Sequence, residues 1–397
     1  MNYYLLFMVT VYCLMVVPIG GDYFYLPRAV ALALVSIAAG YDYFKRTNFI
    51  SLKKCPSLLI FLLLVFISSV LGMDPVNSWF GYPRCTGLST YLFCAVLFMV
   101  AVESRQLQNS ILKYTLFTAM IISVLAILQW FNINLVPHEF YRDAMISYST
   151  MANPNFLASY TVFLLPIAML WWLQQGKRIW LAAAAILFAA LLATTTRGAW
   201  IAFAFTGFYI LVQIFKGKYT WKAFSVLFIT LAVVFLLLAP TRGGLIVSRI
   251  ISIPGQVDAG VKLDGDAGAG RIYIWKESLK LFPQNWAFGI GPENLKYAEI
   301  EPAPWVTADK AHNIFIEILV TMGIFALIAF IIFLARVIKI PENDDEEVIF
   351  LMITTYLVQG FFNIDVIMVM PLFWIIMGFS LGNKLKKLPR RAALITN

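Results

Sequence analysis

The chain has 397 residues, of which 61% are hydrophobic and only 13% are charged, and its formal net charge is +9. Roughly a quarter of the residues of a water-soluble globular domain are charged, so the composition excludes that class. It predicts one polytopic membrane domain over residues 1–397.

Apolar runs of the length that crosses a bilayer recur along almost the whole chain. An α-helix needs roughly 17–25 apolar residues to cross about 30 Å of hydrocarbon. We therefore predict an all-α fold with about twelve transmembrane helices. The first is a retained helix, because it lacks a basic start and a small-residue cleavage site. The expected spans are 3–19, 29–43, 57–73, 88–104, 111–132, 155–173, 179–195, 198–215, 222–239, 313–337, 347–364 and 366–383.

Basic residues concentrate in alternate loops. The positive-inside rule makes these loops cytoplasmic, and with an even number of spans both termini are cytoplasmic too. We expect the positive charge to contact anionic lipid head groups, with no nucleic acid as a partner. The basic residues of these loops are Lys45, Arg46, Lys53, Lys54, Arg105, Lys113, Lys177, Arg178, Lys216, Lys218, Lys222, Arg336, Lys339, Lys384, Lys386, Lys387, Arg390 and Arg391.

Residues 240–311 form the one long polar stretch, and this topology makes it a large extracytoplasmic loop. Its segment RIYIWKESLKLF has helical spacing, with Ile272, Trp275 and Leu279 on one face, so we expect a helix along the bilayer surface. Gly289 and Gly291 predict a turn after it.

The acidic stretch 342–347 is interpreted as a solvated cytoplasmic loop.

Arg197 stands between two apolar runs in LATTTRGAWIAF. A single arginine at a span end often anchors a helix at the head groups. The alternative is an anion clamp, in which Thr194–Thr196 supply hydroxyls, Gly198 allows close backbone approach and the next helix begins with free N–H groups. A lipid diphosphate suits such a place.

Two other outward arginines admit the same pair of interpretations. Arg271 follows the glycine-rich DGDAGAG and begins the surface helix, whereas Arg84 lies beside a turn in GYPRCTGL. Either is an ordinary exposed charge or a guanidinium that binds phosphate.

His138 and His312 are the two histidines, and both face outward in this topology. Each could be a satisfied interfacial residue, but an imidazole is also a natural general base near neutral pH. Asn313 and Glu317 are the polar neighbours that could orient His312, although Glu317 could equally fill a polar gap between helices. The sequence holds no zinc-type spacing, and we expect no metal and no cofactor.

Trp275 is one of several tryptophans in the outer loop. It is interpreted either as part of the interfacial aromatic belt or as a ring that stacks on a sugar.

Taken together, the segments TTTRGAW, GRIYIWKESL, GIGPENL and AHNIFIEILVTMGI resemble those of the O-antigen ligase and O-antigen polymerase superfamily. The upstream segments GYPRCTGL and MANPNFLASY are similar to it as well.

The resemblance implies a GT-C-like glycosyltransferase of the bacterial cytoplasmic membrane, with its active site on the outer side. Such an enzyme moves a glycan from undecaprenyl diphosphate to a hydroxyl of a lipid- or glycan-linked acceptor without a metal. It implies that Arg197 and Arg271 bind the diphosphate and that His312 is the base, with Arg84 as a helper. Single displacement would invert the anomeric centre.

Ligation to a lipid-anchored acceptor is the expected reaction. Repeat-unit polymerisation and protein O-glycosylation share this donor chemistry and remain alternatives. A flippase for the same lipid-linked sugars is the alternative from another class, but transporters usually keep ionisable groups or broken helices near the bilayer midplane. The predicted span centres contain almost no ionisable groups, which favours the enzyme.

Overall fold

The computed structural model describes residues 2–46, 55–136, 146–255, 267–298 and 309–386. Within these ranges the chain is helical apart from turns, bends and an isolated bridge between Ile19 and Asp22. The predicted all-α class is confirmed for this part of the chain.

Long helices form a bundle, and short helices connect them or lie on its surface. The bundle contains α1 (Asn2–Val9), α2 (Val11–Leu14), α3 (Tyr25–Arg46), α5 (Pro56–Leu71), α7 (Leu88–Glu103), α8 (Gln108–Trp130), α9 (Pro154–Gln175), α10 (Arg178–Ala193), α11 (Arg197–Phe215), α12 (Trp221–Leu238), α17 (Ile314–Val337), α18 (Asp344–Gly360) and α19 (Met370–Lys386). The short elements are α6 (Pro75–Phe80), η1 (Arg105–Leu107), η2 (Ser149–Met151), η3 (Arg242–Gly244), α13 (Leu245–Ile251), α15 (Ala267–Lys280), α16 (Phe282–Asn285) and η4 (Leu295–Tyr297).

Five helical segments of the described residues are long and apolar enough to cross a membrane: η1 with α8, α9, α11, α12 and α17. Tyr3–Leu14, α5, α7 and α10 are shorter apolar helices. Each predicted span contains helical residues. The predicted span 3–19 is shorter in the structure, because α2 ends at Leu14 and the backbone of Met15, ahead of Pro18, is extended. These findings are consistent with a membrane protein, and the number of crossings stays a prediction.

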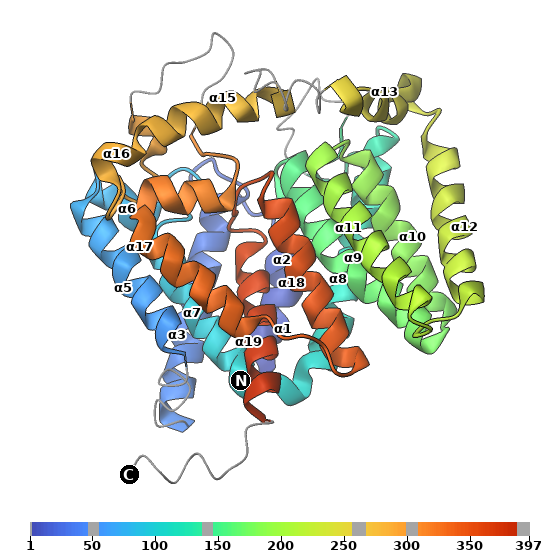
Figure 1. Cartoon of the computed structure of the whole chain (residues 1–397), viewed down its shortest axis with the longest axis horizontal. Helices are drawn as coiled ribbons and strands as arrows, with labels where there is room; N and C mark the ends of the chain where they lie inside the picture. Colours follow the sequence, from blue (N-terminus) through green and yellow to red (C-terminus); the bar gives the residue numbers. More distant parts are fainter. Residues whose placement is uncertain (1, 47–54, 137–145, 256–266, 299–308, 387–397) are drawn as a thin grey trace.

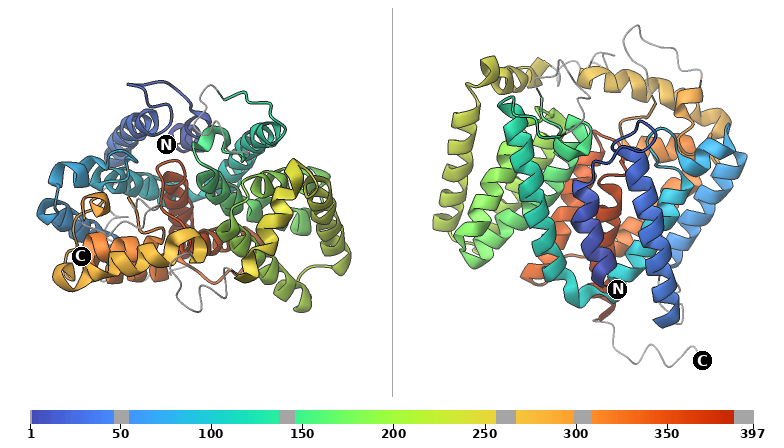
Figure 2. Two further views of the ribbon diagram at one scale, coloured as in Figure 1. Left: turned by 90° about the horizontal axis from the view of Figure 1, so that it is seen from above. Right: turned by 180° about the vertical axis from the view of Figure 1, so that it is seen from behind.

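The long helices run side by side, and α13 and α15 lie across one end of them (Figure 1). We call this the loop-covered end. The turns after α7, α9, α11 and α17 lie at the opposite end (Figures 1 and 2). These turns carry basic residues such as Lys177, Lys216 and Lys339. The positive-inside prediction requires this separation of the two ends, although the orientation in the membrane stays a prediction.

Helix α9 lies inside the bundle, and α12 stands at its edge (Figure 1). Of the most apolar window of each helix, 89% is buried in α9 but only 17% in α12. Phe228, Leu236 and Leu237 of α12 are all more than half exposed. An apolar side chain on an outer helix face is stable against lipid, so we expect α12 to face the bilayer.

Helix α17 is broken at Gly323, whose φ of 86° and ψ of 172° are not helical. The turn after α16 packs against the break. The Gly291 N–H donates to the Thr321 carbonyl at 2.8 Å, and the Ile324 N–H donates to the Trp286 carbonyl at 2.8 Å. Backbone groups that the break releases are thus bonded again, as a low-dielectric interior requires. The turn at Gly289 and Gly291 was predicted, but the break was not.

The interpretation of 342–347 as a solvated loop holds for the exposure of residues 342–345 and is wrong for the rest of the stretch. Most of the stretch is the first turn of α18, where the Asn343 side chain accepts the Glu346 N–H at 2.9 Å. Glu346 and Glu347 are buried because basic residues pair with them, Lys339 at 2.8 Å and Lys218 at 2.8 Å respectively. Carboxylates in a first helical turn also interact favourably with the helix dipole.

The helix predicted for this segment is α15, which lies across the bundle (Figure 1), but the face that it buries differs from the predicted one. Ile274 and Ser278, one turn apart, are buried, whereas Leu279 is 41% exposed. Periodicity identified the helix, but the packing partner chose the contact face.

Gly289→Ala is expected to lower the free energy of unfolding by roughly 2 kcal/mol or more. The residue has a φ of 67°, and an added Cβ would lie 2.3 Å from the Thr321 carbonyl carbon. The midpoint of thermal unfolding in detergent measures the effect. The matched control is Gly207→Ala in α11, where no atom lies within 4 Å of the new Cβ. Equal midpoints for the two variants would refute this account of the turn.

Candidate active site

A pocket of about 250 Å³ opens where the starts of α9 and α11 meet α13 and α15. Three arginines from three separate elements share it: Arg197 of α11, Arg249 of α13 and Arg271 of α15. The structure thus brings together the two arginines expected to bind diphosphate and adds a third. The other lining residues are Ile146, Asn153, Pro154, Asn155, Thr194, Thr195 and Thr196.

The turn between α10 and α11 is built by its threonines. The Thr194 hydroxyl donates to the Leu191 carbonyl at 2.7 Å, and the Thr196 hydroxyl contacts Asn155 Oδ1 at 3.3 Å. Thr195 between them has a positive φ of 49°. The hydroxyls of Thr194 and Thr196 therefore hold the turn in place, which sets the direction in which α11 begins at Arg197.

The expected role of Gly198, close approach of a ligand to the backbone, finds a different explanation. A Cβ at this position would lie 2.8 Å from the Cβ of Phe362, which follows α18. The missing side chain makes room for Phe362, and α11 packs closely there.

Positive charge dominates the pocket. No Asp or Glu is among the described residues that line it. Burial and the charge of Arg197 lower the pKa of Arg271. Two helices of ordinary length, α9 and α11, also begin at the pocket and direct the positive ends of their dipoles at it. Such an arrangement favours an anion.

His312 lies directly before α17 with a φ of 53°. The predicted orienting residues hold the backbone around it. Asn313 Oδ1 accepts the N–H groups of Phe315 and Ile316 at 2.9 and 3.1 Å, so it caps the helix. Glu317 accepts the Ala311 N–H at 2.7 Å. The His312 Nδ1 atom is buried and has no hydrogen-bond partner in the described part of the chain.

The surroundings of His312 keep its imidazole neutral. Burial and the charge of Arg271 lower its pKa from 6.5 to about 4, against the opposing effect of Asp309. This ring is therefore within electrostatic range of the arginine pocket. A neutral imidazole at neutral pH is able to accept a proton.

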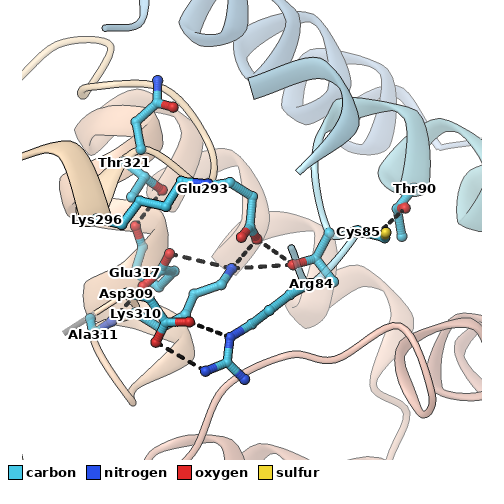
Figure 3. Close-up of polar contacts among 12 residues, drawn as sticks. Arg84, Cys85, Thr90, Glu293, Lys296, Asp309, Lys310, Ala311, Glu317 and Thr321 are labelled. Atoms are coloured by element: carbon cyan, nitrogen blue, oxygen red, sulfur yellow. Dashed lines mark hydrogen bonds and ion pairs between the residues drawn. The ribbon is translucent and has the colours of Figure 1, made fainter. Parts of the chain in front are cut away.

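Lys310, two residues before His312, lies between the carboxylates of Glu293 and Glu317 (Figure 3). It forms an ion pair with Glu293, and its Nζ lies 3.5 Å from Glu317 Oε1. All three side chains are buried. The Thr86 hydroxyl contacts both Lys310, at 3.2 Å, and Glu293. These contacts join the turn at Glu293, the loop before α7 and the start of α17, and so they fix the backbone that leads to His312.

Arg84 does not line the arginine pocket; it is engaged by Asp309 (Figure 3). The guanidinium makes a two-pronged contact, Nε to Oδ2 at 2.5 Å and Nη2 to Oδ1 at 3.0 Å. Although burial opposes the change, the hydrogen bonds and charge of Arg84 lower the pKa of Asp309. Because a carboxylate already neutralises Arg84, its expected help in binding diphosphate would have to compete with Asp309.

Trp275 lies one turn after Arg271 on α15. Its ring meets that of Phe361 edge to face, with centroids 5.7 Å apart. The buried indole Nε1 has no partner among the described residues. The ring thus packs on the segment after α18.

Sequence reasoning missed Arg249 and the ion pairs of Asp309, Lys310 and Glu293. Arg249 was visible as the one charge in GGLIVSRIISIPG, but no spacing links it to Arg197 or Arg271. The predicted outward residue His138 lies outside the described residues.

Lys310→Met is expected to lower the free energy of unfolding by about 3–5 kcal/mol, because it leaves two buried carboxylates without their cation. Lys280→Met is the matched control, since Lys280 is 64% exposed in its pair with Glu277 and should contribute less than about 1 kcal/mol. Unfolding of both variants in detergent gives the comparison. A control that loses as much stability as Lys310→Met would contradict the role given to this cluster.

Residues 182–331 match the family model described as O-antigen ligase. The matched range contains the three pocket arginines and His312, and it excludes Arg84. No curated protein matches the chain significantly. Over residues 182–331, the match confirms the resemblance to the O-antigen ligase/polymerase superfamily that the sequence predicted.

Proposed function

We propose that this protein is a membrane glycosyltransferase that moves a glycan from undecaprenyl diphosphate to an acceptor hydroxyl, as an O-antigen ligase does. The family match supports a ligase or polymerase type of function. The observation that carries the finer proposal is the pocket where Arg197 and Arg271 converge, within electrostatic range of a neutral His312. The acceptor is lipid- or glycan-linked, and membrane lipids surround the bundle.

The site would lie on the outer side of the bacterial cytoplasmic membrane. The apolar helices support a membrane location. The pocket is at the loop-covered end, and the turns rich in basic residues are at the opposite end (Figure 1). By the positive-inside rule the latter end and both termini would be cytoplasmic.

The pocket suits the donor's diphosphate. Guanidinium groups bind phosphate oxygens in pairs, and the N–H groups at the start of α11, whose cap residue Thr196 forms no side-chain hydrogen bond to them, add further donors. Negative charge develops on the diphosphate as the bond between sugar C1 and phosphate oxygen breaks. Fixed positive groups stabilise that charge in the transition state without reorganising, which is the largest effect available to such a site.

His312 would act as the general base. The acceptor oxygen attacks C1, its proton passes to the imidazole, and the electron pair of the broken C1–O bond leaves on the diphosphate. A single displacement of this kind inverts the anomeric centre. The arginine charge that lowers the pKa of His312 is offset when the anionic donor binds. The imidazole therefore becomes a stronger base only when the donor is present.

Repeat-unit polymerisation and protein O-glycosylation use the same donor chemistry and are alternatives within the superfamily. A flippase is the alternative from another class, and the break in α17 is a feature that transporters also use. In this chain the turn after α16 closes the break with backbone hydrogen bonds. This packing favours a structural role for the break and hence the enzyme.

The purified protein, given a glycan on undecaprenyl diphosphate and a matching acceptor, should transfer the glycan in the presence of EDTA. His312→Ala should lower kcat by about 100-fold or more, the usual contribution of a general base. His138→Ala is the control, because it removes the other histidine of the chain. Full transfer by His312→Ala would end the base assignment, and flipping without transfer by the wild-type protein would favour the transporter.

His312 should titrate near pH 4 in the absence of donor. A His138→Ala protein contains one histidine, so its single imidazole signal can be followed by NMR as the pH is lowered. Since the folded-state pKa is depressed to about 4, the ring stays neutral above that pH. Arg271→Gln removes a neighbouring positive charge and should move the midpoint up toward 6.5. A midpoint near 6.5 in both proteins would rule out the electrostatic coupling.

A further inference from the structure

We propose that Arg249 is a third residue of the donor site, and that it acts mainly on the leaving diphosphate. This inference rests on the proposed function and extends it to a residue that the sequence did not single out. The guanidinium comes from α13, which lies across the loop-covered end beside the starts of α9 and α11 (Figure 1).

The position of Arg249 is fixed relative to Arg197. The Ser252 hydroxyl donates to the Arg249 carbonyl at 2.7 Å and accepts from Arg197 Nη1 at 3.1 Å. One serine thus ties the last turn of α13 to the first residue of α11. The tie holds two like charges on the wall of one pocket.

No carboxylate in the described part of the chain forms an ion pair with Arg249. Arg84 has Asp309 and Lys310 has Glu293, so the neighbouring cations are neutralised in the folded protein. Arg249 is half-buried and, together with Arg197, lines a pocket whose described residues include no acid. Holding like charges together costs free energy, which a bound anion would recover.

The number of guanidiniums matches the charge of the product better than that of the donor. A diphosphate that joins a sugar to a polyprenyl chain carries two negative charges. When the C1–O bond breaks, the released oxygen keeps the electron pair, and the proton of the acceptor passes to His312. The leaving diphosphate then carries a third negative charge. Interactions made more strongly with this group than with the donor accelerate the reaction.

Arg249→Gln should therefore lower kcat by about tenfold or more and change the KM for the donor much less, as loss of a charged hydrogen bond in the transition state would. Arg249→Lys keeps the charge without the forked geometry of the guanidinium, and its kcat should fall less. Lys280→Gln is the control, because Lys280 is an exposed cation of the neighbouring helix α15.

Binding of farnesyl diphosphate to the full-length protein in detergent tests the site without catalysis. Farnesyl monophosphate, which has less charge, is the comparison ligand. Arg249→Gln should weaken binding of the diphosphate by about tenfold and binding of the monophosphate less. Lys280→Gln should bind both ligands as the wild type does. Thermal unfolding establishes that the Gln variant is folded. Arg249→Lys is the conservative variant for comparison.

The outcomes separate the two proposals. If Arg197→Gln and Arg271→Gln weaken diphosphate binding and Arg249→Gln does not, the inference about Arg249 is overturned and the proposed donor site stands. If none of the three substitutions weakens binding, the donor site itself is wrong. A tenfold rise in donor KM with unchanged kcat would contradict the assignment of Arg249 to the leaving group.

Discussion

The ammonium group of Lys310 between two buried carboxylates is the interaction on which the geometry of the loop-covered end depends. It joins the turn at Glu293 to the first turns of α17, where Glu317 lies (Figure 3). Every charge of this buried cluster must be paired, because an unpaired member would carry a desolvation penalty of several kcal/mol. The backbone that presents His312 is therefore held by charge pairing on one side and by the Asn313 helix cap on the other.

The cations of this end fall into two groups with different chemistry. Arg84 and Lys310 are neutralised within the protein and hold loops together. Arg197 and Arg249 line a pocket whose described wall has no acid, and the pKa of Arg271 in the same wall is lowered by burial and by Arg197. The first group makes a rigid frame, and the second leaves a positive potential in the described part of the pocket, which an anionic ligand would balance.

Much of the fold was readable from the sequence, because apolar length and helical periodicity are local properties. The same holds for the turn at Gly289, which its glycines signal directly. The break in α17 was not readable, since GIF within a long apolar run looks like continuous helix. Only the turn that packs against Gly323 explains why the helix opens there. The buried face of α15 was missed for the same reason.

The sequence by itself determined the apolar, helical character of a membrane protein, the alternation of basic turns and the residue types of the candidate site, namely arginines and a histidine beside helix starts. The tertiary structure decided which arginines share a pocket and which are paired: it grouped Arg249 with Arg197 and Arg271 and gave Arg84 to Asp309. The reason is physical. Charge interactions depend on distance in space and on burial, and residues far apart in the chain acquire both only when the helices pack.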